Sequence, residues 1–225
     1  QTIALSELAG AYNALGYEND GSYVSAAITF TLDAAGKMTA GADCQPMETN
    51  TCEAWASNEM ATFTAHAEGG FDATDANGTM RAFAFRSADG KVSLFMHHAD
   101  GFFVASKQEA LPLPVAGNAR SWWDMTFNPM GTTGPITNGA MEVVAVDAAN
   151  KSYTRRVPNG DIQTMSFDTP RPGMSYRAAN STVTSAGAAT THPGIVSMAV
   201  PGTGLSVVSF LQPAGPVYAF SMNKP

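Results

Sequence analysis

Hydrophobic and polar residues alternate with a period of two along much of the chain. Ile28, Phe30 and Leu32 alternate with threonines, and Phe63 and Ala65 do the same. This alternation predicts strands with one buried face, whereas a helix would repeat about every 3.6 residues. The pattern predicts an all-β fold of antiparallel meanders, with a short helix possible near residues 3–8. Further strand-like runs span 81–86, 91–96 and 102–107, and turn signals include Asn77-Gly78 and Asp89-Gly90.

The same pattern occurs twice. Residues 33–37, Asp-Ala-Ala-Gly-Lys, recur at 147–151 as Asp-Ala-Ala-Asn-Lys, a shift of 114 positions. The same shift superposes Gly90 on Gly204 and aligns the apolar runs around them. Such self-similarity indicates one structural unit copied in tandem. The copies meet at a proline-containing connector, so we expect two β repeats, at 1–112 and 113–225.

Each copy holds roughly six to eight strands, which is enough to close a small barrel. We therefore expect two β-barrel or barrel-like units related by pseudo-two-fold symmetry. The alternative is that the two copies join into one larger closed sheet or a sandwich.

The two cysteines, Cys44 and Cys52, have seven residues between them. Pro46 and Asn50 favour a reversal of the chain that brings the two sulfur atoms within bonding distance. Structural zinc sites usually place about two to four residues between their cysteines and have further ligands nearby. We therefore predict a disulfide rather than a metal site or two free thiols, and hence an oxidising compartment.

The beginning of the chain and its composition agree with export. The chain starts at Gln1 without an initiator methionine, as expected after removal of a signal peptide or after trimming. Little lysine, with abundant Ala, Thr, Ser and Gly, suits an exported bacterial protein. We expect a periplasmic, extracellular or cell-surface location.

Charge excludes some partners. The formal net charge is −7, and 14% of the residues are charged, against about 25% in an average protein. Nucleic-acid binding needs clustered Lys and Arg, so we expect no such partner. No apolar run approaches the roughly 20 residues of a membrane-spanning helix, so we expect no membrane span.

The acidic residues are concentrated in the first copy. The stretch between Lys37 and Arg81 contains no Lys or Arg. Its acids do not follow the spacing of an EF-hand, so solvated loops are the simpler interpretation. Weak head-to-tail association with the basic second copy is an alternative, and we favour the monomer slightly. The acids are Asp43, Glu48, Glu53, Glu59, Glu68, Asp72 and Asp75, and the second copy carries Arg155, Arg156, Arg171 and Arg177.

No catalytic signature is found. The chain lacks Gly-x-Ser-x-Gly, His-Glu-x-x-His, a phosphate-binding glycine loop and a dinucleotide fingerprint. We therefore name no catalytic residue and no cofactor, and lean against an enzyme. His97 and His98 are adjacent on a strand and point to opposite faces, so they do not ligate one metal together, and we predict no metal site.

Five residues are the candidates for ligand contact. Trp122, Trp123 and Asp124 are where carbohydrate contact is best sought, although anchoring a strand is the simpler role of the tryptophans. Met96 and His98 are the other two candidates. The 12 methionines favour core packing first and an adaptable apolar cavity second.

These observations lead to three functional hypotheses. The first is a module that binds a small molecule or apolar ligand, because the pattern predicts a barrel with a weakly charged interior rich in Met and Phe. The second is a cell-surface interaction or assembly protein in which the repeats act as a spacer. The third is a hydrolase acting on carbohydrate, whose acids the barrel brings together.

Overall fold

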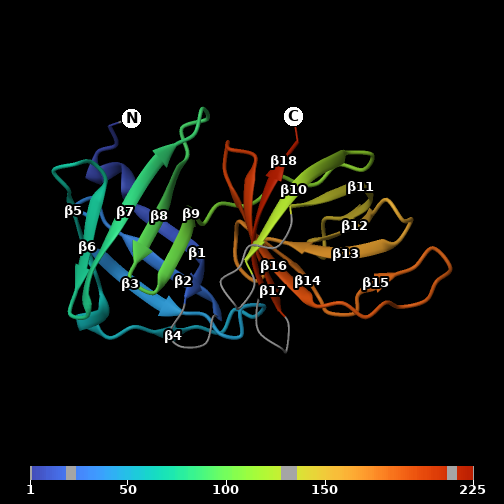
Figure 1. Cartoon of the computed structure of the whole chain (residues 1–225), viewed down its shortest axis with the longest axis horizontal. Coiled ribbons are helices and arrows are strands. Elements are labelled where there is room, and N and C mark those ends of the chain that lie inside the picture. The colour runs from blue at the N-terminus through green and yellow to red at the C-terminus, as the bar shows by residue number, and fades with distance from the viewer. Residues whose placement is uncertain (1, 19–23, 128–135, 212–216, 225) are drawn as a thin grey trace. The chain divides into compact units, whose positions relative to one another are not determined.

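The protein is described by a computed structural model that covers residues 2–18, 24–127, 136–211 and 217–224. The chain divides into two compact units, one made of 1–108 with 200–203 and the other of 109–199 with 204–225. Each unit contains one nine-stranded sheet (Figure 1). The predicted all-β class, with two similar barrel-like units, is confirmed.

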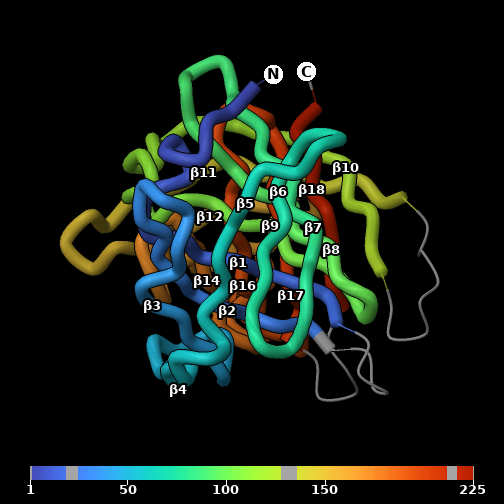
Figure 2. The backbone as a smooth tube through the Cα atoms, turned by 90° about the vertical axis from the view of Figure 1, so that its left-hand side faces the viewer, coloured from blue at the N-terminus to red at the C-terminus, as the bar shows by residue number. Residues whose placement is uncertain are grey.

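The first unit is a curled sheet in the order β4-β3-β2-β1-β9-β8-β7-β6-β5. Its curl brings β3 against β5, where Lys37 and Thr62 form a single isolated bridge. In Figure 2, β5, β6 and β7 pass in front of β1 and β2 of the same unit. The elements are η1 (Leu5–Leu8), β1 (Gly10–Glu18), β2 (Val24–Leu32), β3 (Met38–Asp43), β4 (Glu53–Ala54), η2 (Ser57–Glu59), β5 (Thr62–Ala65), β6 (Phe71–Asp75), β7 (Gly78–Arg86), β8 (Val92–His98) and β9 (Gly101–Lys107).

The second unit is a closed barrel. Its strands follow the order β12-β11-β10-β18-β17-β16-β14-β13-β15, and β12 also pairs with β13. That extra pairing runs from Ser152 opposite Ser166 to Arg156 opposite Ile162 and closes eight strands into a ring. The strands are β10 (Ala119–Phe127), β11 (Thr137–Asp147), β12 (Ser152–Arg156), β13 (Ile162–Phe167), β14 (Met174–Arg177), β15 (Thr182–Val183), β16 (Gly194–Val200), β17 (Leu205–Leu211) and β18 (Val217–Asn223).

The repeated Asp-Ala-Ala-Gly/Asn-Lys segments form hairpin turns at corresponding places, between β2 and β3 and between β11 and β12. The residue with positive φ is Gly36 in the first turn and Lys151 in the second. In each turn the aspartate side chain accepts a backbone hydrogen bond, from Lys37 to Asp33 and from Asn150 to Asp147. The 114-residue shift is therefore structural at this turn. It is not constant, because the same shift carries Gly10, where β1 begins, to the middle of β10.

One end of the first unit is filled by apolar packing. Leu8, at the end of η1, is fully buried and accepts a hydrogen bond from the Tyr12 hydroxyl at 2.7 Å. The Tyr12 ring stacks on Phe30 with the ring centroids 5.0 Å apart, and Phe63 and Leu94 are buried in the same core. The opposite end, where β1, β3, β6 and β8 terminate, is the end that contains a pocket.

The predicted disulfide is confirmed. Cys44 and Cys52 are bonded, and their Cα atoms are 4.1 Å apart. The bond closes the loop between β3 and β4 and stands three residues before Trp55. It therefore constrains the segment that leads into the pocket wall.

Candidate functional site

The first unit contains a pocket of about 460 Å³ at one end of its curled sheet. Its volume lies within the range of about 300–1000 Å³ that is typical of small-molecule sites. Lining residues come from β1, β2, β3, β6, β7, β8 and β9 and from the segment between β3 and β5. Exposed residues such as Asp43, Asn77 and Asp100 form its rim, so the pocket opens to solvent.

The deep part of the pocket is apolar. The apolar side chains that line it point inward from the strands and belong to the buried core of the unit. Three methionines take part, with Met38 and Met96 buried and Met80 partly buried. Methionine is flexible and polarisable, so such a lining adapts to ligands of different shape. The other buried apolar lining residues are Ile28, Ala61, Ala73 and Phe103.

Trp55 forms one wall, in the segment between β4 and η2. Its ring lies directly over Gly41 of β3, where a Cβ atom would be only 2.1 Å from the ring. The backbone N–H of Trp55 also donates to the Gly41 carbonyl at 2.9 Å. The lack of a side chain at Gly41 therefore leaves room for the indole against β3. The disulfide closes the loop that immediately precedes Trp55.

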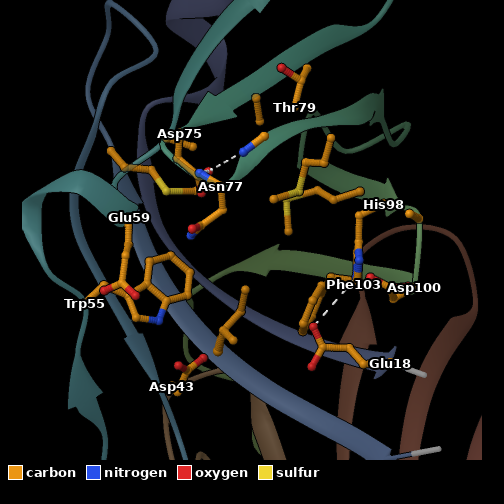
Figure 3. A pocket seen from close by; sticks show the side chains of 18 residues that line it. Glu18, Asp43, Trp55, Glu59, Asp75, Asn77, Thr79, His98, Asp100 and Phe103 are labelled. Carbon is orange, nitrogen blue, oxygen red and sulfur yellow. Dashed lines mark hydrogen bonds and ion pairs between the residues drawn. The ribbon is translucent and has the colours of Figure 1, made fainter. Parts of the chain in front are cut away.

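Carboxylates surround the mouth. Glu18, Asp43 and Asp75 are the last residues of β1, β3 and β6. Glu59 ends η2, and Asp100 lies in the turn between β8 and β9. Figure 3 shows Asp43 and Glu59 on one side of the space and Glu18 and Asp100 on the other. Among the described residues, none that lines the pocket is Lys or Arg.

Two of these carboxylates also hold the local backbone. Asp75 Oδ1 accepts hydrogen bonds from the N–H groups of Asn77 and Gly78, which fixes the turn between β6 and β7. Glu59 Oε2 accepts one from the N–H of Ala56 at the start of η2. Within the described residues, the carboxylates of Asp43 and Asp100 hold no such turn. They are therefore the better positions for substitutions that test the pocket.

Among the described lining residues, His98 carries the one ionisable nitrogen. Its ring stacks on Phe103 with the centroids 5.9 Å apart, and its Nε2 atom lies 3.7 Å from Glu18 Oε1. Burial lowers the pKa of His98, Asp100 raises it and His97 lowers it further. The net shift is downward, so the ring is mostly neutral at neutral pH and adds little positive charge to the acidic mouth.

The candidate residues from the sequence fall into two groups. Met96 and His98 line the pocket. Trp122, Trp123 and Asp124 lie on β10 in the second unit and do not line it.

The Asp124 carboxylate accepts hydrogen bonds from neighbouring side chains. Trp122 Nε1 donates to Asp124 Oδ2 at 2.8 Å, and the Ser221 hydroxyl donates to Oδ1. Arg155 lies over the Trp122 ring, 5.9 Å from its centroid, and donates to Gln163 at 2.8 Å. The contacts are internal, and they agree with an anchoring role for Trp122.

Sequence reasoning did not assign Trp55 or the rim acids to a site. One signal was present, because Asp43, Glu59 and Asp75 belong to the stretch that lacks Lys and Arg. Their convergence on one opening depends on how the strand ends meet. In the described part of the chain, no group of three His, Cys, Asp or Glu residues is arranged to hold a metal ion.

The comparisons with known proteins identify no function. The chain matches no known protein family and no curated protein. Among solved structures it is similar to a protein of unknown function from Nostoc punctiforme, of the DUF3598 family. The two are 10% identical over 99% of this chain and 98% of that one, with a TM-score of 0.30. At this level of similarity the match supports no functional argument.

One further property concerns membranes. Within the described residues, no helix is both long enough and apolar enough to cross a bilayer.

Proposed function

We propose that this protein is a binding module for a small molecule with an apolar body, and that the ligand occupies the pocket of the first unit. The observation that carries the proposal is a cavity of about 460 Å³ whose deep part is lined by buried apolar side chains. A fully packed interior would have left no room for a ligand, since protein cores have few voids larger than a water molecule.

The driving force would be burial of the ligand's apolar surface. Removing apolar surface from water contributes roughly 25 cal/mol per Å² before the costs of association are subtracted. The flexible side chains of Met38, Met80 and Met96 can adjust to the ligand. The module is therefore expected to accept several related molecules.

A neutral fluorescent probe, N-phenyl-1-naphthylamine, tests this proposal. We expect its emission to rise on binding to the protein, and Ala73→Leu to weaken binding about fivefold or more by filling the pocket. Ala73 is buried and lines the pocket. Ala65→Leu, at an exposed position at the end of β5 and outside the pocket lining, is the matched control.

The proposal fails if the probe does not bind, or if the two leucine variants bind it equally well while both remain folded. Native mass spectrometry of the purified protein provides a second measurement. A bound small molecule that is present in the native protein and lost from Ala73→Leu would support the same pocket.

For location and assembly we propose an exported, monomeric protein. The disulfide supports an oxidising compartment such as the periplasm or the cell exterior. Intact mass about two daltons below that of the reduced chain, in protein purified from its native source, tests this. Sedimentation at low and high salt tests the monomer, since head-to-tail pairing of opposite charges would weaken with salt.

A cell-surface interaction role is the second candidate, and one surface favours it. Trp123 of β10 and Met222 of β18 are exposed cross-strand neighbours, and Met125 is exposed on the same strand as Trp123. Exposed aromatic and Met side chains are typical of protein contacts. Replacing Trp123 and Met222 with serine should abolish partner binding in this case and leave probe binding unchanged.

A further inference from the structure

The pocket combines two chemistries at different depths. Its deep part is apolar, with Met38, Met96 and Ala73 buried. Its mouth carries five carboxylates. A ligand that satisfies both needs an apolar body and a head group that is favoured beside negative charge.

The carboxylates at the mouth have little positive charge beside them. Within the described part of the chain no Lys or Arg lines the pocket, and His98 is held mostly neutral by its burial. A low-dielectric wall on one side of such charges strengthens their field in the opening. An anionic head group would be repelled, and a neutral one would gain nothing from this field.

The arrangement suits an organic cation better than a metal ion. A calcium site needs six to eight oxygen ligands converging at about 2.3–2.6 Å. Among the described residues no group of three acidic or histidine side chains is arranged in that way. Figure 3 shows the labelled acids spread around the space, with Glu59 and Glu18 on opposite sides. A diffuse negative field matches a cation with a large radius.

Aromatic rings complete the environment. Trp55 forms one wall, and Phe103 lies on the other side of the space, stacked with His98. A ligand ammonium group placed over a tryptophan or phenylalanine face is attracted by the ring quadrupole. Aromatic faces next to carboxylates are a combination that recognises alkylated or arylalkyl amines.

We infer that the ligand of this pocket is a small organic amine, bound as a cation, with its apolar body on the methionine-lined floor and its ammonium group at the acidic mouth. The inference rests on the proposed function and names the chemical class of the ligand. It predicts a preference between head groups that apolar burial alone does not produce.

Three compounds that share one skeleton test the inference: 4-phenylbutylamine, 4-phenylbutanol and 4-phenylbutyrate. Calorimetric titration at low salt should show the amine binding about tenfold more tightly than the alcohol, and the carboxylate binding weakest. Raising the salt from about 20 to about 500 mM should reduce the preference of amine over alcohol, because screening shortens the range of the field.

Substitutions at the mouth locate the effect. Asp43→Asn and Asp100→Asn should each weaken amine binding about threefold and leave alcohol binding unchanged. Glu68→Gln is the matched control, because it removes the same charge in the turn between β5 and β6, outside the pocket lining. It should change neither affinity.

The outcomes separate the inference from the proposed function. Binding of the alcohol and the neutral probe without any preference for the amine would overturn the inference and leave the proposed function standing. Tightest binding of the carboxylate, or displacement of the amine by micromolar Ca²⁺, would also overturn it. If none of the three compounds nor the probe binds, both statements fall.

Discussion

The two units close their sheets differently. In the first, β3 and β5 meet at the single bridge between Lys37 and Thr62. In the second, β12 and β13 pair over five residues on each strand. Residues 44–61 connect β3 to β5, whereas only 157–161 connect β12 to β13. The longer connection carries the disulfide and Trp55, so it supplies a pocket wall where the second unit has continuous strand pairing.

The polar groups differ in the same way. Asp124 of the second unit accepts hydrogen bonds from Trp122 and Ser221, and Arg155 lies close enough to interact with its charge. In the first unit, Asp43 and Asp100 lie at an opening whose described lining contains no Lys or Arg. The comparison shows that a carboxylate paired with neighbouring side chains in one copy has a counterpart in the other copy in carboxylates that surround an opening.

The largest expected effect comes from the loop that only the first unit has. Replacing both Cys44 and Cys52 with serine should lower the free energy of unfolding by about 2.5 kcal/mol in the loop-entropy model. Probe binding should also weaken, because the segment before Trp55 is released. Urea unfolding with and without reductant measures this. The wild-type protein should shift on reduction and the double variant should not.

Two glycines, one in each unit, lie under a tryptophan ring, and they test whether only the Trp55 ring contributes to the pocket. A Cβ on Gly41 would be 2.1 Å from the Trp55 ring, and one on Gly139 would be 2.2 Å from the Trp122 ring. Both alanine variants should lose about 2 kcal/mol of stability through overpacking. Only Gly41→Ala should weaken probe binding. If both variants lost probe binding equally, the pocket of the first unit would not be the site that binds the probe.

Two aspartates test the difference in charge pairing. Asp124→Asn should cost about 1–2 kcal/mol in the free energy of unfolding, because it disturbs hydrogen bonds from Trp122 and Ser221 and removes a charge near Arg155. Asp43→Asn should change the free energy of unfolding by about 0.5 kcal/mol or less, because Asp43 is exposed. A large loss in Asp43→Asn would show that its carboxylate is already used internally.

The smallest effect concerns pH. Because burial lowers the pKa of His98 in the folded state, the unfolded state binds its proton first as the pH falls. The stability associated with the neutral ring is therefore present above the ordinary histidine pKa of about 6.5 and is lost as the pH decreases through the lower folded value.

Substitution isolates that contribution. His98→Gln should flatten the dependence of unfolding free energy on pH between about 7 and 5. His97→Gln, at the exposed neighbouring position, removes only the smallest of the three influences on the His98 pKa, so it should alter the dependence less than His98→Gln does. Identical pH profiles for the wild type and His98→Gln would contradict the role assigned to His98.

Local features of this protein could be predicted because they depend on neighbouring residues. The alternation around Phe30 and Phe63 indicated strands, and both residues are buried in β2 and β5. The short separation of Cys44 and Cys52 made their bond predictable. The repeated segments at 33–37 and 147–151 indicated two similar units, and in both an aspartate accepts backbone hydrogen bonds within a hairpin turn.

The candidate site was only partly predictable. Met96 and His98 were named, whereas Trp55 and the acids at the mouth were not assigned to it. By itself the sequence determined the strands, the turns, the disulfide and an acidic first copy. Tertiary structure alone decided that Glu18, Asp43 and Asp100 meet at one opening, because they lie at the ends of β1 and β3 and in the turn after β8, which are separate in the chain. It also decided how each sheet closes, since the last pair of strands meets along its length in the second unit and at one bridge in the first.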